Sequence, residues 1–270
     1  MLRSMKDMEN YSISATDGII GQVKDFYFDD IAWVIRYVVV ETGTWLSSRE
    51  VLVSPIAIGQ PNSTDKLLPA SITKEQVKNS PDIDTMKPVS RQHEISYLDY
   101  YGYPNYWGGP GLWGEDMYPY MMMPGYIGIG VTENERIEAK NSRERDEEAR
   151  HRNDDPHLRS CHAVKKYFVH AVDGDIGHVS GYLIDDETWA IRYLVVDTSN
   201  WWLGHQVLIA PQWIQDVSWF DGRVSVNLTR QAVKDAPPYD PVEHVDRNQE
   251  TKIYDHYGYT RYWAVRKLDQ

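Results

Sequence analysis

The chain has 270 residues, 41% of them hydrophobic, which is enough to build one large core or two modest ones. Its formal net charge is −12. A surface of that sign repels phosphate backbones, so no nucleic-acid partner is expected. The single cysteine, Cys161, excludes an intrachain disulfide framework and a cysteine-rich metal site. A reducing cytoplasm is therefore the expected location.

The chain contains no segment that looks like a membrane anchor. Its first ten residues, MLRSMKDMEN, lack the apolar core of a signal peptide. No run approaches the ~18 apolar residues of a membrane-spanning helix. The nearest run, residues 117–131, is broken by two prolines and three glycines. We therefore expect no transmembrane segment.

The sequence repeats itself without gaps, because residues 2–107 align with residues 158–263 at a constant offset of 156. Roughly 39 of about 106 aligned positions are identical, far beyond chance for a gapless register. The sequence thus predicts two homologous domains, residues 1–107 and 158–270, separated by a linker at 108–157. The identities include Leu2–Ser4 with Leu158–Ser160, Asp29-Asp30 with Asp185-Asp186, Ile35–Tyr37 with Ile191–Tyr193, and Tyr101–Tyr103 with Tyr257–Tyr259.

Within each copy the pattern favours short β-strands separated by turn residues. A short helix is then expected to open at Thr73 or Thr229 and to stop before Pro81 or Pro237. Each copy ends in an aromatic tail with the pattern Tyr-Gly-Tyr-x-x-Tyr-Trp. Such a series of strands predicts a small barrel or sandwich. The expected strands are 20–28, 33–40, 50–53 and 67–68 in the first copy and 176–184, 189–196, 206–209 and 223–226 in the second.

The expected strand 33–40 is apolar on both faces, apart from Arg36. A barrel strand needs one apolar face for the interior, so the apolar outer face also requires cover. We expect the cover to be the short helix, the aromatic tail or the sister copy. The two copies are predicted to pack as an internal pseudo-dimer about a rough two-fold axis.

The runs Gly18–Asp30, Trp33–Val40 and Arg49–Pro55, with their counterparts in the second copy, resemble the PRC-barrel family. That family includes the cytoplasmic domain of the photosynthetic reaction-centre H subunit and the C-terminal domain of a ribosome-maturation factor. The resemblance covers most of the chain and implies a mainly β protein with two small PRC-type β-barrels in tandem, each followed by a short helix and an aromatic tail. Its motifs specify architecture more than activity. The matching segments are Gly18–Asp30, Trp33–Val40, Arg49–Pro55, Gly174–Val179, Ile184–Asp186, Arg192–Asp197 and Val207–Pro211.

The resemblance implies a docking module that sits on a larger assembly. We expect a non-enzymatic, cytoplasmic binding or scaffold protein with a protein partner and no cofactor. One alternative is an accessory factor that docks on a membrane electron-transfer complex, and another is a ribosome-maturation-like assembly factor. Contact with a membrane complex from its periphery and formation of a homodimer are both compatible with these hypotheses. A hydrolase or metal-dependent enzyme is the least favoured hypothesis.

Acidic pairs and mid-strand arginines are the candidates for site chemistry. The acidic pairs could bind a cation or act as general acid and base, but aspartate also caps tight turns, and turn chemistry explains both copies. A buried arginine needs a partner, so we favour structural ion pairs. The histidines around the start of the second copy match no standard zinc spacing, and no catalytic, cofactor-binding or metal-ligating residue is predicted. The candidate ion-pair residues are Arg36, Arg192, Asp29, Asp30, Asp185 and Asp186.

The linker has two halves of different composition. Residues 108–130 are rich in Gly, Pro, Tyr and Met, whereas residues 132–157 are mostly charged and are expected to form an exposed helix or a mobile connection. The apolar half could contact a partner or lie in a groove between the barrels. The candidate contact residues are Met121, Met122, Met123 and Tyr126.

Overall fold

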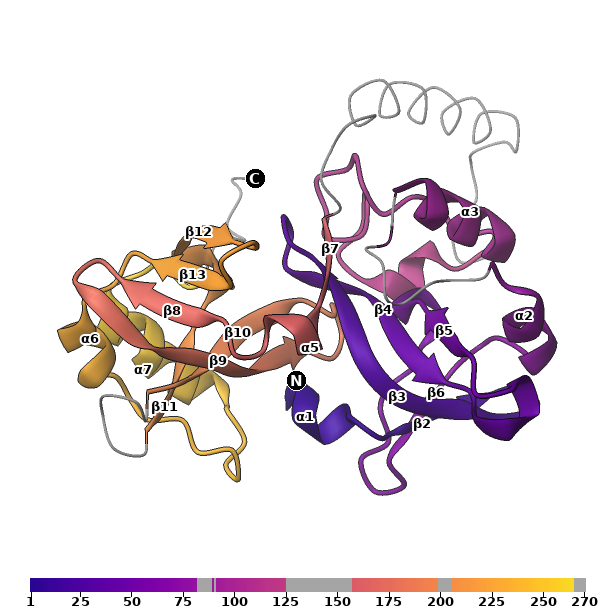
Figure 1. The fold of residues 1–270 in the computed structure, drawn as a ribbon, viewed down its shortest axis with the longest axis horizontal. Helices are drawn as coiled ribbons and strands as arrows, with labels where there is room; N and C mark the ends of the chain where they lie inside the picture. The colour runs from indigo at the N-terminus through magenta and orange to yellow at the C-terminus, as the bar shows by residue number, and fades with distance from the viewer. Residues whose placement is uncertain (82–88, 90, 125–156, 199–204, 265–270) are drawn as a thin grey trace. The chain divides into compact units, whose positions relative to one another are not determined.

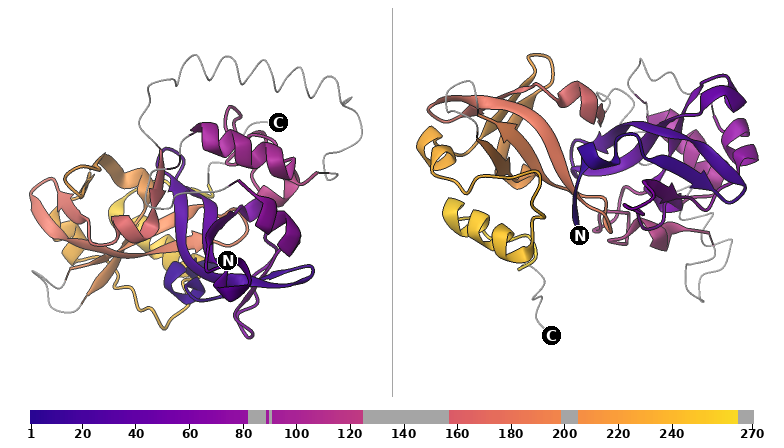
Figure 2. Two further views of the ribbon diagram at one scale, coloured as in Figure 1. Left: turned by 45° about the vertical axis from the view of Figure 1, so that its right-hand side comes forward. Right: turned by 90° about the horizontal axis from the view of Figure 1, so that it is seen from below.

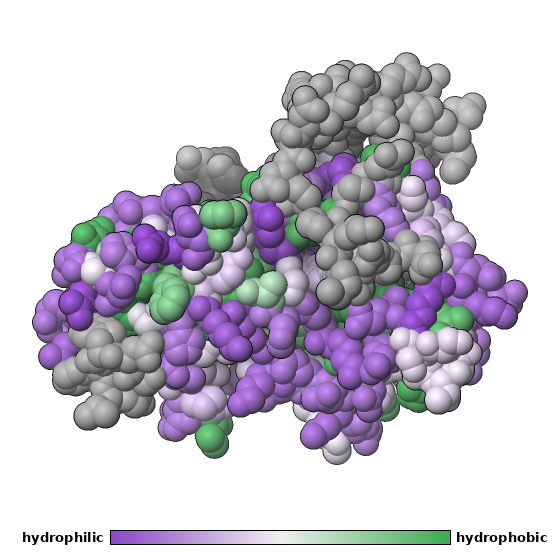
Figure 3. All heavy atoms as spheres, viewed as in Figure 1, coloured by the Kyte–Doolittle hydropathy of each residue, from purple (hydrophilic) through white to green (hydrophobic). Residues whose placement is uncertain are grey.

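The computed structural model describes residues 1–81, 89, 91–124, 157–198 and 205–264. They form two compact units that are mainly β (Figure 1). The N-unit comprises Met8–Cys161 and Asp186–Ala190. The C-unit comprises Met1–Asp7, His162–Asp185 and Ile191–Gln270. The surface in view is mostly polar, with apolar residues scattered over it (Figure 3).

The N-unit is built around the twelve-residue strand β3. Strand β4 pairs along one edge of β3, and β2 and β7 pair with successive parts of its other edge. Strand β5 lies beyond β4, and β6 runs parallel to β2. The strands are β2 (Ser12–Ala15), β3 (Gly18–Asp29), β4 (Val34–Glu41), β5 (Glu50–Val53), β6 (Leu67–Pro69) and β7 (Leu158–Ser160).

The C-unit repeats this plan around β9. Strand β10 pairs along one edge, β8 and β1 along the other, and a hairpin of β12 and β13 continues the sheet from β8. In the described parts of both units the end strands of the sheet do not pair with each other. The strands are β1 (Leu2–Ser4), β8 (Phe168–Ala171), β9 (Gly174–Asp185), β10 (Ile191–Asp197), β11 (Gln206–Ile209), β12 (Ile214–Ser218) and β13 (Arg223–Val226).

Each unit contains a short strand that belongs, in sequence, to the other repeat. Strand β1 pairs with β9, so that Leu2 lies opposite Asp185, whereas β7 pairs with β3, so that Leu158 lies opposite Asp29. The two registers are equivalent at the repeat offset of 156. The units therefore differ from the repeats in these segments, and the linker residues up to 124 belong to the N-unit. The expected two-fold pairing of the copies stays a prediction.

Helices cover the sheets where the sequence analysis expected only a short helix and a tail. The short helices are present as α2 (Lys74–Asn79), which begins with a Thr73 capping box, and α6 (Arg230–Lys234). The tails, however, begin with eleven-residue helices, α3 (Arg91–Tyr101) and α7 (Arg247–Tyr257). The remaining short elements are α1 (Met5–Met8), α5 (Cys161–Val164) and the 3-10 turns η1 (Gly43–Leu46), η2 (Pro55–Ala57), η3 (Pro119–Met122) and η4 (Pro211–Trp213).

The long tail helices shelter the strands that are apolar on both faces. Every residue of β4 from Val34 to Val40 is buried. The ring of Tyr97 on α3 packs edge-on against Tyr37, with ring centroids 5.1 Å apart. In the C-unit, Tyr254 on α7 packs against Tyr193 of β10, and Figure 2 shows α7 along one face of that sheet. The aromatic tail is thus the cover, one of the three that the sequence left open. No helix among the described residues is long and apolar enough to cross a membrane.

Candidate functional site: a polar cluster present in both units

The turn after β3 positions the first residue of the cluster. The carboxylate of Asp29 accepts hydrogen bonds from the backbone N–H groups of Ile31 (2.9 Å) and Ala32 (3.1 Å). The N–H of Trp33 closes the turn on the Asp29 carbonyl at 2.7 Å. Trp33 has φ of 54° and its repeat counterpart Trp189 has φ of 59°, a left-handed conformation that is uncommon for bulky residues. Asp29 therefore has the turn-capping role expected for it.

The same carboxylate also pairs with an arginine. Arg36 Nη2 lies 3.2 Å from Asp29 Oδ2, with both side chains buried. Arg36 Nη1 donates to the carbonyl of Leu112 at 2.6 Å, and its guanidinium lies 4.0 Å from the ring centroid of Tyr106. Burial acts to raise the pKa of Asp29, but Arg36, the two turn N–H groups and His157 outweigh it and hold that pKa below its ordinary value. The structural ion pair predicted from the sequence is present.

A β-bulge turns the arginine toward the tail helix. Tyr27 pairs with Tyr37 and Phe28 with Ile35, so Arg36 is the extra residue of the bulge. In the C-unit a register shift leaves Arg192 in the same position between Ile191 and Tyr193. An extra residue bends the strand and redirects its side chain. Arg36 and Arg192 can therefore reach the tail tyrosines Tyr106 and Tyr262 from the middle of an apolar strand.

A buried glutamate on α3 completes the cluster in the N-unit. Glu94 is 0% exposed. Its Oε1 lies 3.3 Å from Arg91 Nη1 and 3.3 Å from His157 Nε2, and its Oε2 accepts a hydrogen bond from the Tyr106 hydroxyl. The spacing of Arg91 and Glu94 places both on one face of the helix, which is why one turn of α3 can supply a charge pair. We call Asp29, Arg36, Arg91, Glu94 and Tyr106 the N-cluster.

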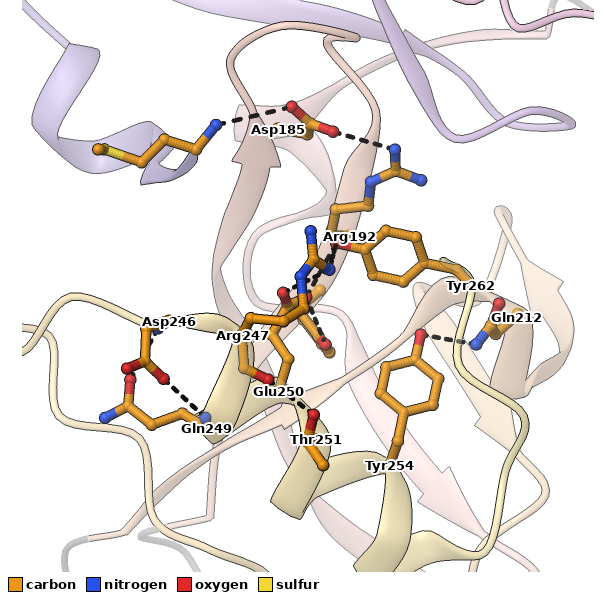
Figure 4. A network of polar contacts seen from close by, with 12 residues as sticks. Asp185, Arg192, Gln212, Asp246, Arg247, Gln249, Glu250, Thr251, Tyr254 and Tyr262 are labelled. Atoms are coloured by element: carbon orange, nitrogen blue, oxygen red, sulfur yellow. Dashed lines mark hydrogen bonds and ion pairs between the residues drawn. The ribbon is translucent and has the colours of Figure 1, made fainter. Parts of the chain in front are cut away.

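The C-unit holds the same set of residues, which Figure 4 shows. Arg192 Nη2 lies 3.1 Å from Asp185 Oδ2. On α7, Glu250 pairs with Arg247 at 2.8 Å and accepts hydrogen bonds from the hydroxyls of Tyr193 (3.0 Å) and Tyr262 (2.9 Å). The guanidinium of Arg192 lies 4.2 Å from the ring centroid of Tyr262. We call Asp185, Arg192, Arg247, Glu250 and Tyr262 the C-cluster.

Local sequence fixes the position of the C-cluster helix. Asp246 caps α7 through a reciprocal capping box with Gln249, with bonds of 2.8 and 2.9 Å (Figure 4). Gly258 ends the helix with φ of 71°, the left-handed conformation that suits glycine. The helix is therefore bounded at both ends, which sets where Arg247 and Glu250 meet the sheet.

Burial governs the electrostatics of the C-cluster. It raises the pKa of Glu250 above its ordinary value, although the hydrogen bonds from Tyr262 and Tyr193 and the charge of Arg247 act the other way. Burial, together with the nearby Glu250 charge, raises the pKa of Tyr262 to about 12. Glu250 is 2% exposed, so a substrate could reach it only if α7 moved. The arrangement is suited to fastening α7 to the sheet.

Sequence reasoning found part of this site and missed the rest. It singled out Asp29, Arg36 and their counterparts and missed the charged residues of α3 and α7. The signal was available, because Arg91 aligns with Arg247 and Glu94 with Glu250 at the repeat offset. They were missed because they precede the predicted aromatic tails, in segments for which no helix was expected.

The other predicted site residues have different surroundings. Asp30 lies 2.8 Å from Arg159, and burial raises its pKa despite that charge. Its counterpart Asp186 is buried. Within the described ranges, no three His, Cys, Asp or Glu side chains gather as metal ligands would.

The methionine-rich stretch of the linker packs on the N-unit. The turn η3 lies beside η2, and Met122 is 3% exposed. Met122 is therefore part of the core of the N-unit. Met121 and Met123 are half-buried, and Tyr126 lies outside the described residues.

Comparison with known proteins adds no assignment. No family model matches the chain, and no curated protein sequence matches it. The function must therefore be argued from the residues themselves.

Proposed function

We propose that the chain is a non-enzymatic binding or scaffold protein built on two PRC-barrel-type units. The two clusters support this proposal, because their carboxylates face arginines and tyrosines inside the fold and not an open cleft. The observation that carries the proposal is an exposed aromatic surface on the C-unit. It consists of the exposed Phe168 and Phe220 together with the half-buried Trp219, and we call it the aromatic patch.

The aromatic patch lies at one end of the C-unit sheet. Phe220 is 98% exposed and Phe168 is 56% exposed. The N–H of Phe168 donates to the carbonyl of Gly222 at 2.8 Å, which places the start of β8 beside the turn that carries Phe220. The hydroxyl of Tyr167 donates to the Trp219 carbonyl at 3.1 Å and steadies the same turn. Large aromatic side chains held at a surface are typical of protein interfaces.

The N-unit has no equivalent of this surface. The positions that correspond to Phe168, Trp219 and Phe220 are Ser12, Ser63 and Thr64. The parallel pairing that holds this end of the sheet does not require aromatic residues, since β2 pairs with β6 in the N-unit as β8 pairs with β13 in the C-unit. Exposed apolar groups that the fold does not need favour a binding role.

Mutation of the patch tests the proposal. The double variant Phe168→Ser/Phe220→Ser would be compared with wild type as bait in native cell extract, with quantitative mass spectrometry of captured proteins. The matched control is Ile31→Ser, which replaces an apolar residue that is 82% exposed on the N-unit. We expect specific partners to fall at least about tenfold with the double variant and to stay with the control, because hot-spot aromatics dominate interfaces.

The identity of the captured material separates the alternatives. Capture of membrane-complex subunits, with salt-releasable pelleting of the protein on native membranes, would favour the electron-transfer accessory role. Capture of ribosomal particles would favour the assembly-factor role. An unchanged set of captured proteins with the double variant would contradict a binding role for the patch.

A further inference from the structure

Both repeats begin with the same short strand, and each unit binds the strand of the other repeat. Strand β1 has the sequence Leu-Arg-Ser and so does β7. Ser4 lies opposite Leu183 on β9, and Ser160 lies opposite Tyr27 on β3, in equivalent registers. The edge of β9 from Leu183 to Asp185 is thus a slot that is filled by a strand of the sequence Leu-Arg-Ser. We call it the strand slot.

The two copies of this strand are held differently. In the N-unit Leu158 is 4% exposed, Arg159 pairs with Asp30 at 2.8 Å, and Ser160 donates to the carboxylate of Asp25. In the C-unit all three residues of β1 are partly exposed to solvent. The two strands thus differ in burial at their first residue, since Leu158 is buried and Leu2 is partly exposed.

The connections of the two strands also differ. Strand β1 is joined to the N-unit by one crossing of the chain, between Asp7 and Met8. Strand β7, in contrast, lies between the linker and the crossing at Cys161. For β1 to pair with another copy of the chain, only the connection between Asp7 and Met8 has to take a different course. For β7 to do so, the rest of the second repeat, which follows β7 in the chain, would have to move with it.

We propose that the strand slot also binds β1 of a second copy of this chain, which gives a strand-exchanged dimer. The dimer keeps every contact of the slot, including the burial of Met5 (1% exposed), because each slot is filled by an identical segment. Only the connectivity changes, so protein concentration decides between the two forms. Release of β1 exposes Met5, so the two forms exchange slowly once folded.

Cysteine pairs can distinguish exchange between chains from pairing within one chain. All variants carry Cys161→Ala, which removes the natural thiol. A full-length Ser4→Cys chain is mixed with a full-length Leu183→Cys chain of different mass, refolded together, oxidised and analysed by non-reducing gel and mass spectrometry. Opposed residues of an antiparallel pair lie within disulfide reach. The double variant Ser4→Cys/Leu183→Cys reports pairing within one chain, and a Ser160→Cys chain mixed with a Tyr27→Cys chain is the matched control for β7.

The expected result has three parts. The double variant cross-links as a monomer in dilute solution. The mixed Ser4→Cys and Leu183→Cys chains form a heterodimer whose yield rises about tenfold between roughly 10 μM and roughly 1 mM refolding concentration. The β7 control yields no heterodimer above background.

Three other results would overturn the proposal. A double variant that cross-links within the monomer, with no heterodimer at any concentration, shows that the slot accepts only its own strand. A β7 control that cross-links between chains equally well shows exchange of whole repeats. A double variant that fails to cross-link shows that β1 does not occupy the slot.

Discussion

The N-cluster and the C-cluster contain the same residue types, yet water reaches them to different extents. The Arg36 side chain is 3% exposed, whereas that of Arg192 is 17% exposed. The difference comes from the linker, since Trp113 lies over Arg36 at 4.8 Å from the ring centroid and is itself 1% exposed. The linker, which lies outside the repeat, therefore shields the N-cluster from water, although the two clusters contain the same residue types.

A second difference lies at the 3-10 turn before the hairpin. In the C-unit Trp213 is buried and packs against Tyr257 and Tyr259, with ring centroids 4.8 and 5.2 Å away. The N-unit has Ala57 at this position, and the linker turn η3 lies beside η2 there. The linker supplies the N-unit with apolar cover that the C-unit obtains from one tryptophan. The N-unit therefore uses linker residues as cover at this turn, whereas the described part of the C-unit uses a tryptophan of its own repeat.

Removal of the linker tryptophan should have the largest effect. Trp113→Ala deletes a buried ring and its hydrogen bond to the Thr188 carbonyl (2.9 Å). We expect the N-unit to lose about 3–5 kcal/mol, the usual result for such truncations. Hydrogen exchange followed by mass spectrometry would show faster exchange in α3 and unchanged exchange in α7. Equal effects on both helices would contradict the assignment of Trp113 to the N-unit.

Neutralising each buried glutamate should show which cluster contributes more to the free energy of unfolding. Glu94→Gln leaves Arg91 and His157, whose side chains are 25% and 16% exposed, without their carboxylate partner, so we expect a loss of about 3 kcal/mol. Glu250→Gln should cost about 1 kcal/mol, because the Arg247 side chain is 56% exposed and can be hydrated. Urea unfolding with local probes on α3 and α7 measures both values. A larger loss for Glu250→Gln would reverse our ranking.

The tyrosines beside the bulges should behave in opposite ways. The Tyr193 hydroxyl donates to Glu250, whereas that of Tyr37 is buried and has no hydrogen-bond partner among the described residues. Tyr193→Phe should therefore cost about 1 kcal/mol, and Tyr37→Phe should be neutral or stabilising. Thermal unfolding of the matched pair tests this, and an equal loss for both would contradict it.

The pH dependence should have opposite signs in the two clusters. The lowered pKa of Asp29 gives stability that is present above its ordinary pKa of 3.8 and is lost as pH falls through the folded pKa. The raised pKa of Glu250 gives stability that is present below its ordinary pKa of 4.5 and is lost as pH rises through the folded pKa. On acidification the penalty of Asp29→Asn should shrink, and that of Glu250→Gln should grow. Denaturant titrations of both variants against wild type at several pH values measure these slopes, and slopes of the same sign would contradict the account.

Local patterns in the sequence predicted the strands well, but they did not predict the helices α3 and α7 that cover the sheets. Strands β3 and β4 were expected because β-branched and aromatic residues lie between aspartate turns. Helix α3 was missed because Tyr97, Tyr100 and Tyr101 drew attention to aromatic character and obscured the helical spacing of Arg91 and Glu94. The pairing of β1 with β9 of the other repeat was beyond prediction, since three residues carry too little pattern and the partner strand lies far along the chain.

The sequence predicted a contact between residues that are close in the chain and missed contacts between residues that are far apart. The pair of Asp29 and Arg36 was predictable because a buried charge near a turn aspartate has few other partners. The contact of Trp113 with Arg36 joins residues 77 positions apart in the sequence, and no local pattern indicates it. The repeat offset was the strongest available signal for the rest, because it aligns every residue of one cluster with its counterpart in the other.

In each cluster a buried glutamate on the tail helix accepts a hydrogen bond from a tail tyrosine, whose ring packs on the arginine of the sheet, and this link fastens the helix. A double-mutant cycle tests it directly, with Glu250→Gln and Tyr262→Phe in the C-unit and Glu94→Gln and Tyr106→Phe in the N-unit. We predict coupling free energies of about 0.5–3 kcal/mol in both units, with the larger value in the dry N-cluster. Additive effects of the two substitutions in either unit would contradict the claim.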